Sequence, residues 1–382
     1  MLDCADFTWP PLDQSPAPRI IAPPHLAGWA KKLEVYLADK ARPHTIGFAT
    51  SGSSGGIPKA ILFTRDALEY CAQGAINHFG TLENNSRDEH GDWVCPLPPW
   101  HVGGAMISIR AHLAGVKVHT LTGKWDPSRY ADLMRSTKSR WSSLVPTQVI
   151  DLVTSHISAP TGIHCIIVGG GHLDTSIGQE ARQLGWPVVQ SYGMTEAGSQ
   201  IATALPQDPF HTDKLNILPH WETRLAPNGR LSLHGKGLFY GQAEMTPLDD
   251  KPSTLSFEQL TPNAWWTSKD LVQLNQNTIS FIRRADRIIK ILGELVDPDI
   301  IEQTLSPICP NLVIEPIPHP RMGYELVACH PNAQLLEKAC THWNLSAPGF
   351  QRITRQACLT IPRNTMGKIE RTQLRSQLTI NP

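Results

Sequence analysis

Short apolar runs alternate with amphipathic stretches between residues 44 and 196. Strand-like runs that alternate with helix-like segments predict an α/β domain built on parallel strands. Two of the runs, CIIVGGGHL (165–173) and PVVQSYGMTE (187–196), end in glycine-rich or polar turns. Ligands gather at such carboxyl ends of strands in open α/β sheets. The other strand-like runs are HTIGFAT (44–50), DWVCPLP (92–98), VKVHTL (116–121) and RWSSLVP (140–146).

The pattern differs at both ends of the chain. The proline-rich start carries one amphipathic stretch, LAGWAKKLEVYLADK (26–40), which predicts a helix ahead of a first strand at 44–50. After Thr203, shorter alternating runs predict a β-rich subdomain. The charged segment RRADRIIKILGE (283–294) then leads into a tail of small-domain size. We therefore predict a large domain over 1–283 and a small α+β domain over 284–382.

Composition narrows the classes of function. The 34 basic and 34 acidic side chains cancel, so no overall charge draws the protein to nucleic acid or to an anionic membrane. The N-terminal residues do not resemble a secretory signal, and no apolar run is long enough to span a bilayer. The eight cysteines lack a C-x-x-C pair, which favours reduced thiols. These features predict a cytoplasmic protein.

A segment of small residues, ATSGSSGGIPKA (49–60), stands out from the rest of the chain. We expect it to link a strand to a helix. Its backbone N–H groups and hydroxyls would then surround a phosphate, and Lys59 would add a cation. A flexible surface loop is the alternative interpretation. The segment is not a G-x-x-x-x-G-K-[ST] loop, because Pro58 precedes the lysine and Ala60 follows it.

A second segment, SYGMTEAGS (191–199), follows an apolar run. Together with the first it resembles the signature of the adenylate-forming superfamily of acyl-CoA ligases, luciferases and peptide-synthetase adenylation domains. The resemblance implies that Tyr192 lies along the adenine, Thr195 contacts the α-phosphate, and Glu196 helps to hold Mg²⁺, with Gly193 also in the ATP site. Alternatively, Tyr192 is a core aromatic and Glu196 a carboxylate at a helix N-terminus. The ATP-binding residues implied in the first segment are Thr50, Ser51, Gly52, Ser53, Ser54, Gly55 and Lys59.

Three later segments extend the resemblance over nearly the whole chain. WWTSKDLVQL resembles the segment whose aspartate binds ribose hydroxyls, which implies that role for Asp270. In RRADRIIKILGE the resemblance implies that Arg284 meets the nucleotide and that Asp286 is the hinge between domains. IPRNTMGKIERTQL resembles the motif P-x-[ST]-x-x-G-K, so Lys368 would be the catalytic lysine of adenylation.

PLPPWHVGGAMISIRAHLAG (96–115) and SLVPTQVIDLV (143–153) are similar to the o-succinylbenzoate:CoA ligases of menaquinone biosynthesis. This resemblance implies that His101 takes part in catalysis and in acyl binding. The substrate activated by such ligases keeps a second carboxylate, which is costly to bury without a cation. Arg110 is our candidate partner, because guanidinium matches a planar carboxylate in bidentate geometry. An exposed arginine on a helix is the alternative.

Small residues at two strand ends complete the predicted site. The turn at Gly169–Gly171 lets the backbone approach a ligand closely, or is simply a tight turn. We assign Gly169 and Ser191 to the acyl substrate and Gly170 to ATP. The chain also departs from the family pattern: Gly56 is an extra residue, Ser268 and Lys269 replace the usual Thr-Gly, and Leu295 replaces an arginine. The first motif comes early, which implies an N-terminally shortened α/β fold.

The resemblance implies an ATP-dependent ligase that works in two steps. A carboxylic acid, o-succinylbenzoate in our reading, attacks Mg-ATP to form an acyl-adenylate, and coenzyme A then displaces AMP. One alternative is an acyl-CoA synthetase for another aromatic or aliphatic acid. Another is a catalytically silent nucleotide-binding relative. We expect no nucleic-acid partner, since no basic stripe with interleaved aromatics occurs. A homodimer is one option for the oligomeric state.

Overall fold

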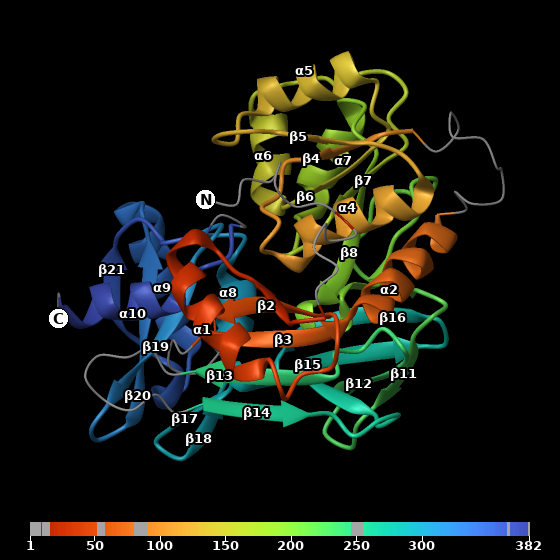
Figure 1. Cartoon of the computed structure of the whole chain (residues 1–382). Helices are drawn as coiled ribbons and strands as arrows, with labels where there is room; N and C mark the ends of the chain where they lie inside the picture. Colours follow the sequence, from red (N-terminus) through yellow and green to blue (C-terminus); the bar gives the residue numbers. More distant parts are fainter. Residues whose placement is uncertain are drawn as a thin grey trace. The chain divides into compact units, whose positions relative to one another are not determined.

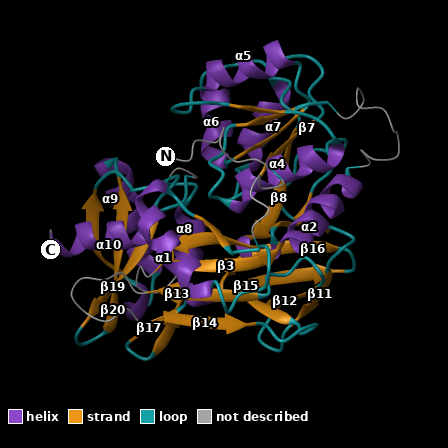
Figure 2. Ribbon diagram, viewed as in Figure 1, coloured by secondary structure: helices purple, strands orange, loops and turns teal. Residues whose placement is uncertain are grey.

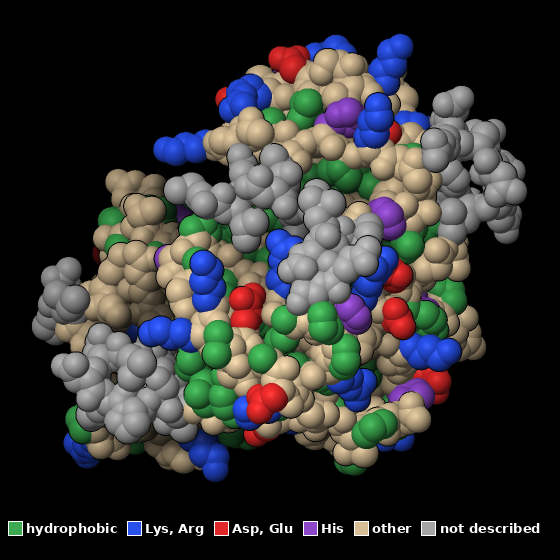
Figure 3. All heavy atoms as spheres, in the orientation of Figure 1, with side chains coloured by type: hydrophobic (Ala, Val, Ile, Leu, Met, Phe, Trp, Pro, Cys, Tyr) green, Lys and Arg blue, Asp and Glu red, His purple; other side chains and the backbone are tan. Residues whose placement is uncertain are grey.

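The computed structural model of the chain describes residues 9, 16–51, 58–79, 91–245, 255–364 and 367–380 (Figures 1 and 2). It divides into two compact units. The first unit comprises Met1–Ser268 and Gln273–Phe281, and the second comprises Lys269–Val272 and Ile282–Pro382. The domain ranges predicted from the sequence, 1–283 and 284–382, stay a prediction. On the face drawn in Figure 3, basic and acidic side chains are interspersed, in keeping with the balanced composition.

Parallel strands form one part of a large sheet, which has 11 strands in the described residues, as the alternating pattern predicts. These parallel strands run in the order β8-β7-β6-β4-β5, and each neighbouring pair is parallel. The strands are β4 (Trp93–Cys95), β5 (Val118–Thr120), β6 (Trp141–Leu144), β7 (Cys165–Val168) and β8 (Val188–Met194). The helices between them are α4 (Val102–Ala114), α5 (Pro127–Thr137), α6 (Pro146–Thr154) and α7 (Thr175–Gln183).

Local sequence explains where these helices begin. Asp126 caps α5 by accepting from Arg129 N, and Asp174 caps α7 by accepting from Ser176 N. Both α5 and α6 start with proline, which has no N–H to lose at the first helical position. The helices cover an apolar core around the fully buried Tyr130 and Trp186. The sheet therefore holds the carboxyl ends of β4, β7 and β8 in fixed positions.

A second sheet of unit 1 corrects two expectations. It has the order β1-β2-β3-β13-β14, so the first strand is β1 (Arg19–Ile21), not residues 44–50. The small-residue segment lies between β2 (Thr45–Ser51) and β3 (Pro58–Thr64), which pair antiparallel; the expected strand-to-helix link is wrong. Residues 60–63 are fully buried on both faces, which suits a central strand. The sheet also contains β13 (Gly241–Met245) and β14 (Leu255–Gln259), and α1 (Ala27–Leu37) packs against it.

Helix α2 (Arg65–His78) begins only after β3. Thr64 Oγ1 caps it by accepting from Ala67 N at 3.2 Å. The amphipathic stretch predicted near the N-terminus is confirmed as α1. The β-rich part after Thr203 is also confirmed, because β8 is followed in the large sheet by β9, β10, β16, β15, β12 and β11. These strands are β9 (Ser199–Thr203), β10 (Leu215–Ile217), β11 (Glu222–Leu225), β12 (Arg230–His234), β15 (Trp266–Asn275) and β16 (Thr278–Arg284).

Unit 2 has its own small sheet and core. The sheet order is β19-β20-β21, and a hairpin of β17 and β18 precedes it in the chain. Its strands are β17 (Ile289–Ile291), β18 (Glu294–Val296), β19 (Val313–His319), β20 (Gly323–His330) and β21 (Ile353–Cys358), and its helices are α8 (Pro298–Leu305), α9 (Ala333–Ser346) and α10 (Arg371–Ile380). Leu374 and Leu378 of α10 are buried in one of its two apolar clusters. The tail therefore has the α+β organisation predicted for it.

The cysteines of the described ranges are free thiols. Six of them are buried and Cys358 is exposed. Burial raises the pKa of the Cys71 thiol to about 12, which makes it a poor nucleophile at neutral pH. None of the helices in the described ranges combines the length and the apolar character that crossing a membrane requires.

Candidate active site

The two signature segments meet in unit 1. Lys59 of β3 lies with its Nζ 3.9 Å from Glu196 Oε1, and both side chains are about one fifth exposed. Lys59 Nζ also donates to Gln242 Oε1 at 3.4 Å. Thr50 of β2 stands opposite Lys59 in the register of the hairpin. A lysine and a carboxylate at an open strand end suit the binding of a phosphate and a cation together.

The structure describes the two ends of the small-residue segment but not its middle. Thr50 Oγ1 donates to Lys59 O at 3.4 Å, and Ser51 ends β2. The predicted ATP-binding residues Gly52, Ser53, Ser54 and Gly55 lie outside the described residues. Their roles therefore stay a prediction from the sequence.

A constrained turn carries the second segment. A Cβ on Gly193 would lie 1.6 Å from Ser199 O, so the backbone of β9 leaves no room for a side chain there. The short helix η3 (Thr195–Ala197) follows at once and places Thr195 and Glu196 at the end of β8. Tyr192 packs its ring 5.8 Å from that of Phe281. The glycine of the motif is thus explained by a close backbone approach.

The turn after β7 is also shaped by glycine. Gly170 has φ of 79°, a left-handed conformation that side chains rarely adopt. A Cβ on Gly169 would meet no atom within 4 Å. The backbone at Gly169 is therefore open to a ligand, as the predicted role requires.

His101 occupies the N-cap position of α4, just after β4. Its carbonyl accepts from Gly104 N at 2.9 Å and from Ala105 N at 3.1 Å. A Cβ on Gly104 would lie 2.3 Å from Pro98 O, so glycine allows the helix start to approach the preceding turn. Arg110 follows nine residues later on the same helix, about 13 Å along its axis.

Arg110 is buried, with only 3% of its surface exposed, so the alternative of an exposed arginine is wrong. Its Nη2 donates to Gln200 Oε1 at 2.6 Å, and Gln200 Nε2 donates to Ser191 Oγ at 3.2 Å. Arg110 Nε has no hydrogen-bond partner, and no acidic side chain among the described residues pairs with this guanidinium. Burial lowers the pKa of Arg110 to about 10, so it keeps its charge at neutral pH. Burial of a cation without an acidic partner is costly, which makes Arg110 a candidate contact for an anion.

A cavity adjoins Arg110. Trp93 and Trp141 stack in its wall with ring centroids 5.4 Å apart, and the Arg110 guanidinium lies 6.0 Å from the Trp93 ring centre. The lining residues are Ala75, Ile76, Phe79, Trp93, Arg110, Ala114 and Trp141. Apart from Arg110 the lining is aromatic and aliphatic, so one buried cation faces apolar walls, and the free volume of about 20 Å³ is close to the space that one water needs.

Sequence reasoning missed Gln200 and two histidines: His220, which is near Arg110, and His78, which is near His220. His220 packs against Gly74 of α2, where a Cβ would lie 1.9 Å from its Nδ1, and its ring makes an edge contact with Tyr70. Neither ring nitrogen of His220 has a partner in the described part of the chain, and the same holds for His78 Nε2. Burial, together with the charges of Arg110 and His78, lowers the pKa of His220 to about 4. Neither histidine belongs to a motif, so the sequence does not distinguish them from ordinary core residues.

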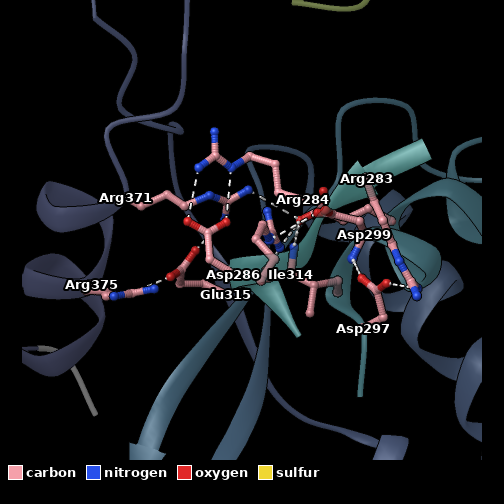
Figure 4. A network of polar contacts seen from close by, with 11 residues as sticks. Arg283, Arg284, Asp286, Asp297, Asp299, Ile314, Glu315, Arg371 and Arg375 are labelled. Atoms are coloured by element: carbon pink, nitrogen blue, oxygen red, sulfur yellow. Dashed lines mark hydrogen bonds and ion pairs between the residues drawn. The ribbon is translucent and has the colours of Figure 1, made fainter. Parts of the chain in front are cut away.

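A second group of predicted residues meets within unit 2. The Arg284 guanidinium makes two 3.0 Å hydrogen bonds to the Asp286 carboxylate, and its Nη1 lies 3.6 Å from Asp270 Oδ1 (Figure 4 shows the first pair). Lys269 Nζ lies 3.4 Å from Asp286 Oδ2. Burial acts to raise the pKa of Asp286, but the hydrogen bonds and charge of Arg284, together with Lys269, lower it on balance. The predicted hinge and two predicted nucleotide contacts thus form one charged cluster.

Lys368 lies elsewhere in unit 2, in a turn before α10. Its N–H donates to Asn364 Oδ1 at 3.1 Å, and its carbonyl accepts from Asn364 N at 2.9 Å. Lys368 is exposed, as a lysine that reaches a ligand requires. Among the described residues, no three His, Cys, Asp or Glu side chains gather as a ready-made metal site. A single Glu196 still fits Mg²⁺, which is often held by one carboxylate and substrate phosphates.

Comparison with known proteins identifies the relatives of this chain. Residues 25–226 match the family of AMP-binding enzymes. A 2-succinylbenzoate–CoA ligase of Listeria monocytogenes is 28% identical over 263 residues, a match that covers 67% of this chain and 52% of the relative. The chain therefore spans about half the length of the curated relatives it matches.

Two solved structures share the fold. One is o-succinylbenzoate coenzyme A synthetase (MenE) from Bacillus subtilis in complex with ATP and magnesium ion, with a TM-score of 0.68, 20% identity, and coverage of 94% of this chain and 79% of that one. The other is ATP-bound MatB from Rhodopseudomonas palustris, with a TM-score of 0.69, 18% identity and the same coverage. The two scores are nearly equal, so the fold alone does not select a substrate. With the family match over more than half of its length, the chain belongs to the AMP-binding enzymes.

Proposed function

We propose that this protein is an AMP-forming carboxylate–CoA ligase whose acid is o-succinylbenzoate. The family match and the relatives named 2-succinylbenzoate–CoA ligase support the class of reaction. The observation that carries the substrate is the buried guanidinium of Arg110, which has no acidic partner in the described part of the chain and lies beside an apolar cavity. In this proposal, the carboxylate that is not activated pairs with the guanidinium of Arg110.

In the first step, the succinyl carboxylate attacks the α-phosphorus of ATP, and pyrophosphate leaves. Lys59 supplies positive charge at the phosphates, and Thr195 supplies a hydroxyl donor at the end of β8. Mg²⁺, held by Glu196 and the phosphates, would neutralise charge on the leaving group. Fixed donors of this kind stabilise the charge that develops on the phosphate oxygens. Lys368 bridges the carboxylate and the α-phosphate in our scheme, and Tyr192, Gly193, Gly170, Asp270 and Arg284 bind the nucleotide.

Arg110 orients the acid by pairing with the aromatic carboxylate. Gln200 holds the guanidinium from one side, and Ser191 holds Gln200, so the cation is fixed before the ligand arrives. A fixed cation loses little freedom on binding, which is the basis of a specificity contact. His101 and Gly169, at the carboxyl ends of β4 and β7, line the path to the reacting carboxylate in this proposal.

In the second step, the coenzyme A thiolate attacks the acyl carbon and AMP leaves. We propose that the small domain turns about Asp286 between the steps and so withdraws Lys368 from the acyl-adenylate. The charged cluster at Asp286 supports this role, because Arg284 and Lys269 both contact its carboxylate. Such gating lets one site serve two reactions. A homodimeric state and a cytoplasmic location stay predictions.

The test is a matched pair of acids. o-Succinylbenzoate and 4-oxo-4-phenylbutanoate differ only in the aromatic carboxylate, and each is supplied with ATP, Mg²⁺ and coenzyme A. We expect kcat/KM for o-succinylbenzoate to be higher by about 100-fold, and Arg110→Met to remove most of this preference. Benzoate and a medium-chain fatty acid complete the panel.

Other outcomes select the alternatives. Equal rates on the matched pair would discard o-succinylbenzoate while keeping the ligase. Folded protein that binds ATP but forms neither AMP nor thioester with any acid would instead identify a silent nucleotide-binding relative. Lys368→Ala provides the control for catalysis, since it should abolish adenylation without loss of fold.

A further inference from the structure

A buried carboxylate in unit 2 fixes the helix that follows Lys368. Glu315 of β19 has no exposed side-chain surface. It accepts hydrogen bonds from Arg371 Nη1 at 2.5 Å and from Arg375 Nε at 2.6 Å, and both arginines belong to α10 (Figure 4). The two bonds reach different oxygens of the carboxylate, so α10 is held at two successive turns.

A second carboxylate extends this cluster. Glu302 of α8 accepts from Arg287 Nη2 at 3.1 Å and from Ile314 N at 2.8 Å, and its Oε1 lies 3.8 Å from Arg371 Nη2. Arg287 also pairs with Asp299 at 3.0 Å. Arg371 therefore lies between two acids that come from different elements. Buried ion pairs contribute little net stability compared with apolar packing, so we infer that this cluster acts on the position of α10.

The turn that carries Lys368 is joined directly to α10. Only Ile369 and Glu370 separate Lys368 from Arg371. Gly367 N donates to Asn364 O at 2.8 Å, and Glu370 N donates to Pro362 O at 2.8 Å. Arg363 pairs with Ile369 in an isolated bridge that closes the turn. A displacement of the start of α10 would therefore move Lys368 with it.

We propose that Glu315 is a positioning residue for Lys368 in acyl-adenylate formation, acting through Arg371 and Arg375. The proposal rests on the proposed function. Leu374 and Leu378 pack α10 on apolar neighbours, but apolar contacts tolerate small slides along the helix axis. Two hydrogen-bonded ion pairs to one buried carboxylate fix the position of α10 along its axis. A misplacement of a catalytic group by about 1 Å can lower a rate by about 100-fold.

Separate assays of the two half-reactions test this role. Glu315→Gln and Arg375→Gln are each compared with Lys368→Ala. Arg375→Gln is the milder change, because the Arg375 side chain is half exposed. We expect both to slow adenylate formation at least about tenfold while thioester formation from preformed acyl-adenylate stays within about twofold. Leu336→Ala is the matched control, because it removes core packing in unit 2 outside the cluster that holds α10. Equal slowing of both half-reactions by Glu315→Gln would overturn the proposal.

Amide hydrogen exchange gives a readout that does not depend on turnover. Glu315→Gln should speed exchange at Gly367, Lys368 and Glu370 at least about tenfold, with Leu336→Ala leaving these amides protected. Unchanged protection in Glu315→Gln overturns the proposal whether or not the enzyme is active. Wild-type protein that forms no adenylate with any acid would refute the proposed function, while loss of protection confined to this turn would still support the link from Glu315 to Lys368.

Discussion

Arg110 Nη2 donates a 2.6 Å hydrogen bond to Gln200 Oε1, so a buried guanidinium contacts a neutral amide instead of a carboxylate. Among the described residues no acid balances its charge. Burial of an unbalanced cation lowers the stability of the free protein. A buried cation of this kind, although it lowers stability, is expected where a ligand of opposite charge binds.

Replacing Arg110 with methionine should therefore stabilise the fold. We expect Arg110→Met to raise the free energy of unfolding by about 1–3 kcal/mol, as measured by urea denaturation. The double variant Arg110→Met/Gln200→Leu should gain at least as much, because it leaves no unpaired amide oxygen. A loss of more than about 1 kcal/mol in the single variant would show that the guanidinium is balanced in the free protein.

Glu196→Gln should weaken the response to Mg²⁺ in particular. The amide keeps the shape of the side chain but loses the charge that binds the cation. We expect the Mg²⁺ concentration for half-maximal adenylation to rise at least about tenfold. Asp132→Asn, at an exposed position of α5 in the same unit, serves as the control. The assignment fails if Glu196→Gln lowers kcat at an unchanged Mg²⁺ requirement.

Gly74→Ala should destabilise unit 1. The new Cβ would lie 1.9 Å from His220 Nδ1, so the buried ring must shift. Overpacking of this kind costs about 1–3 kcal/mol. Gly28→Ala is the matched control, because a Cβ on this exposed glycine of α1 would meet no atom within 4 Å, and the variant should gain about 0.5–1 kcal/mol. Thermal unfolding of both variants decides the point.

Stability should fall as the pH drops from 6.5 toward 4. The pKa of His220 is about 4 in the fold, against 6.5 in the unfolded chain, so the unfolded chain binds more protons in this window. The contribution of His220 is complete above pH 6.5, and about 2–3 kcal/mol of it is lost by pH 4. His220→Phe should remove about this much of the dependence in urea unfolding at stepped pH, while burial of His78 and His164, which lowers the pKa of both, leaves a residual slope. An unchanged slope in the variant would refute the shifted pKa.

The sequence is informative where chemistry and backbone demand particular residues. The alternation of apolar runs and amphipathic helices predicts the parallel sheet, because each strand must be buried on both faces. The glycine before Met194 is predictable from its motif, and the structure explains it by the backbone of Ser199. Lys59 and Glu196 are likewise predictable from their two motifs, although these motifs lie far apart along the chain.

Other features cannot be found in one sequence. Gln200 is one polar residue in the short strand β9, and only the fold shows that it links Arg110 to Ser191. The run Ala60–Phe63 is apolar at every position, so periodicity does not separate a buried strand from a helix. Glu315 has no motif of its own, since its partners on α10 are more than fifty residues away. Such pairings depend on tertiary packing.

The contrast between Cys358 and the buried thiols has a practical consequence. In the described ranges it is the one exposed cysteine, and it lies on β21 of the second unit. With Cys4 replaced, since it lies outside the described residues, a maleimide dye would attach at Cys358 without disturbing either core. A second dye placed on the first unit would then report the proposed turn about Asp286 as a change of energy transfer, if that turn takes place, one molecule at a time.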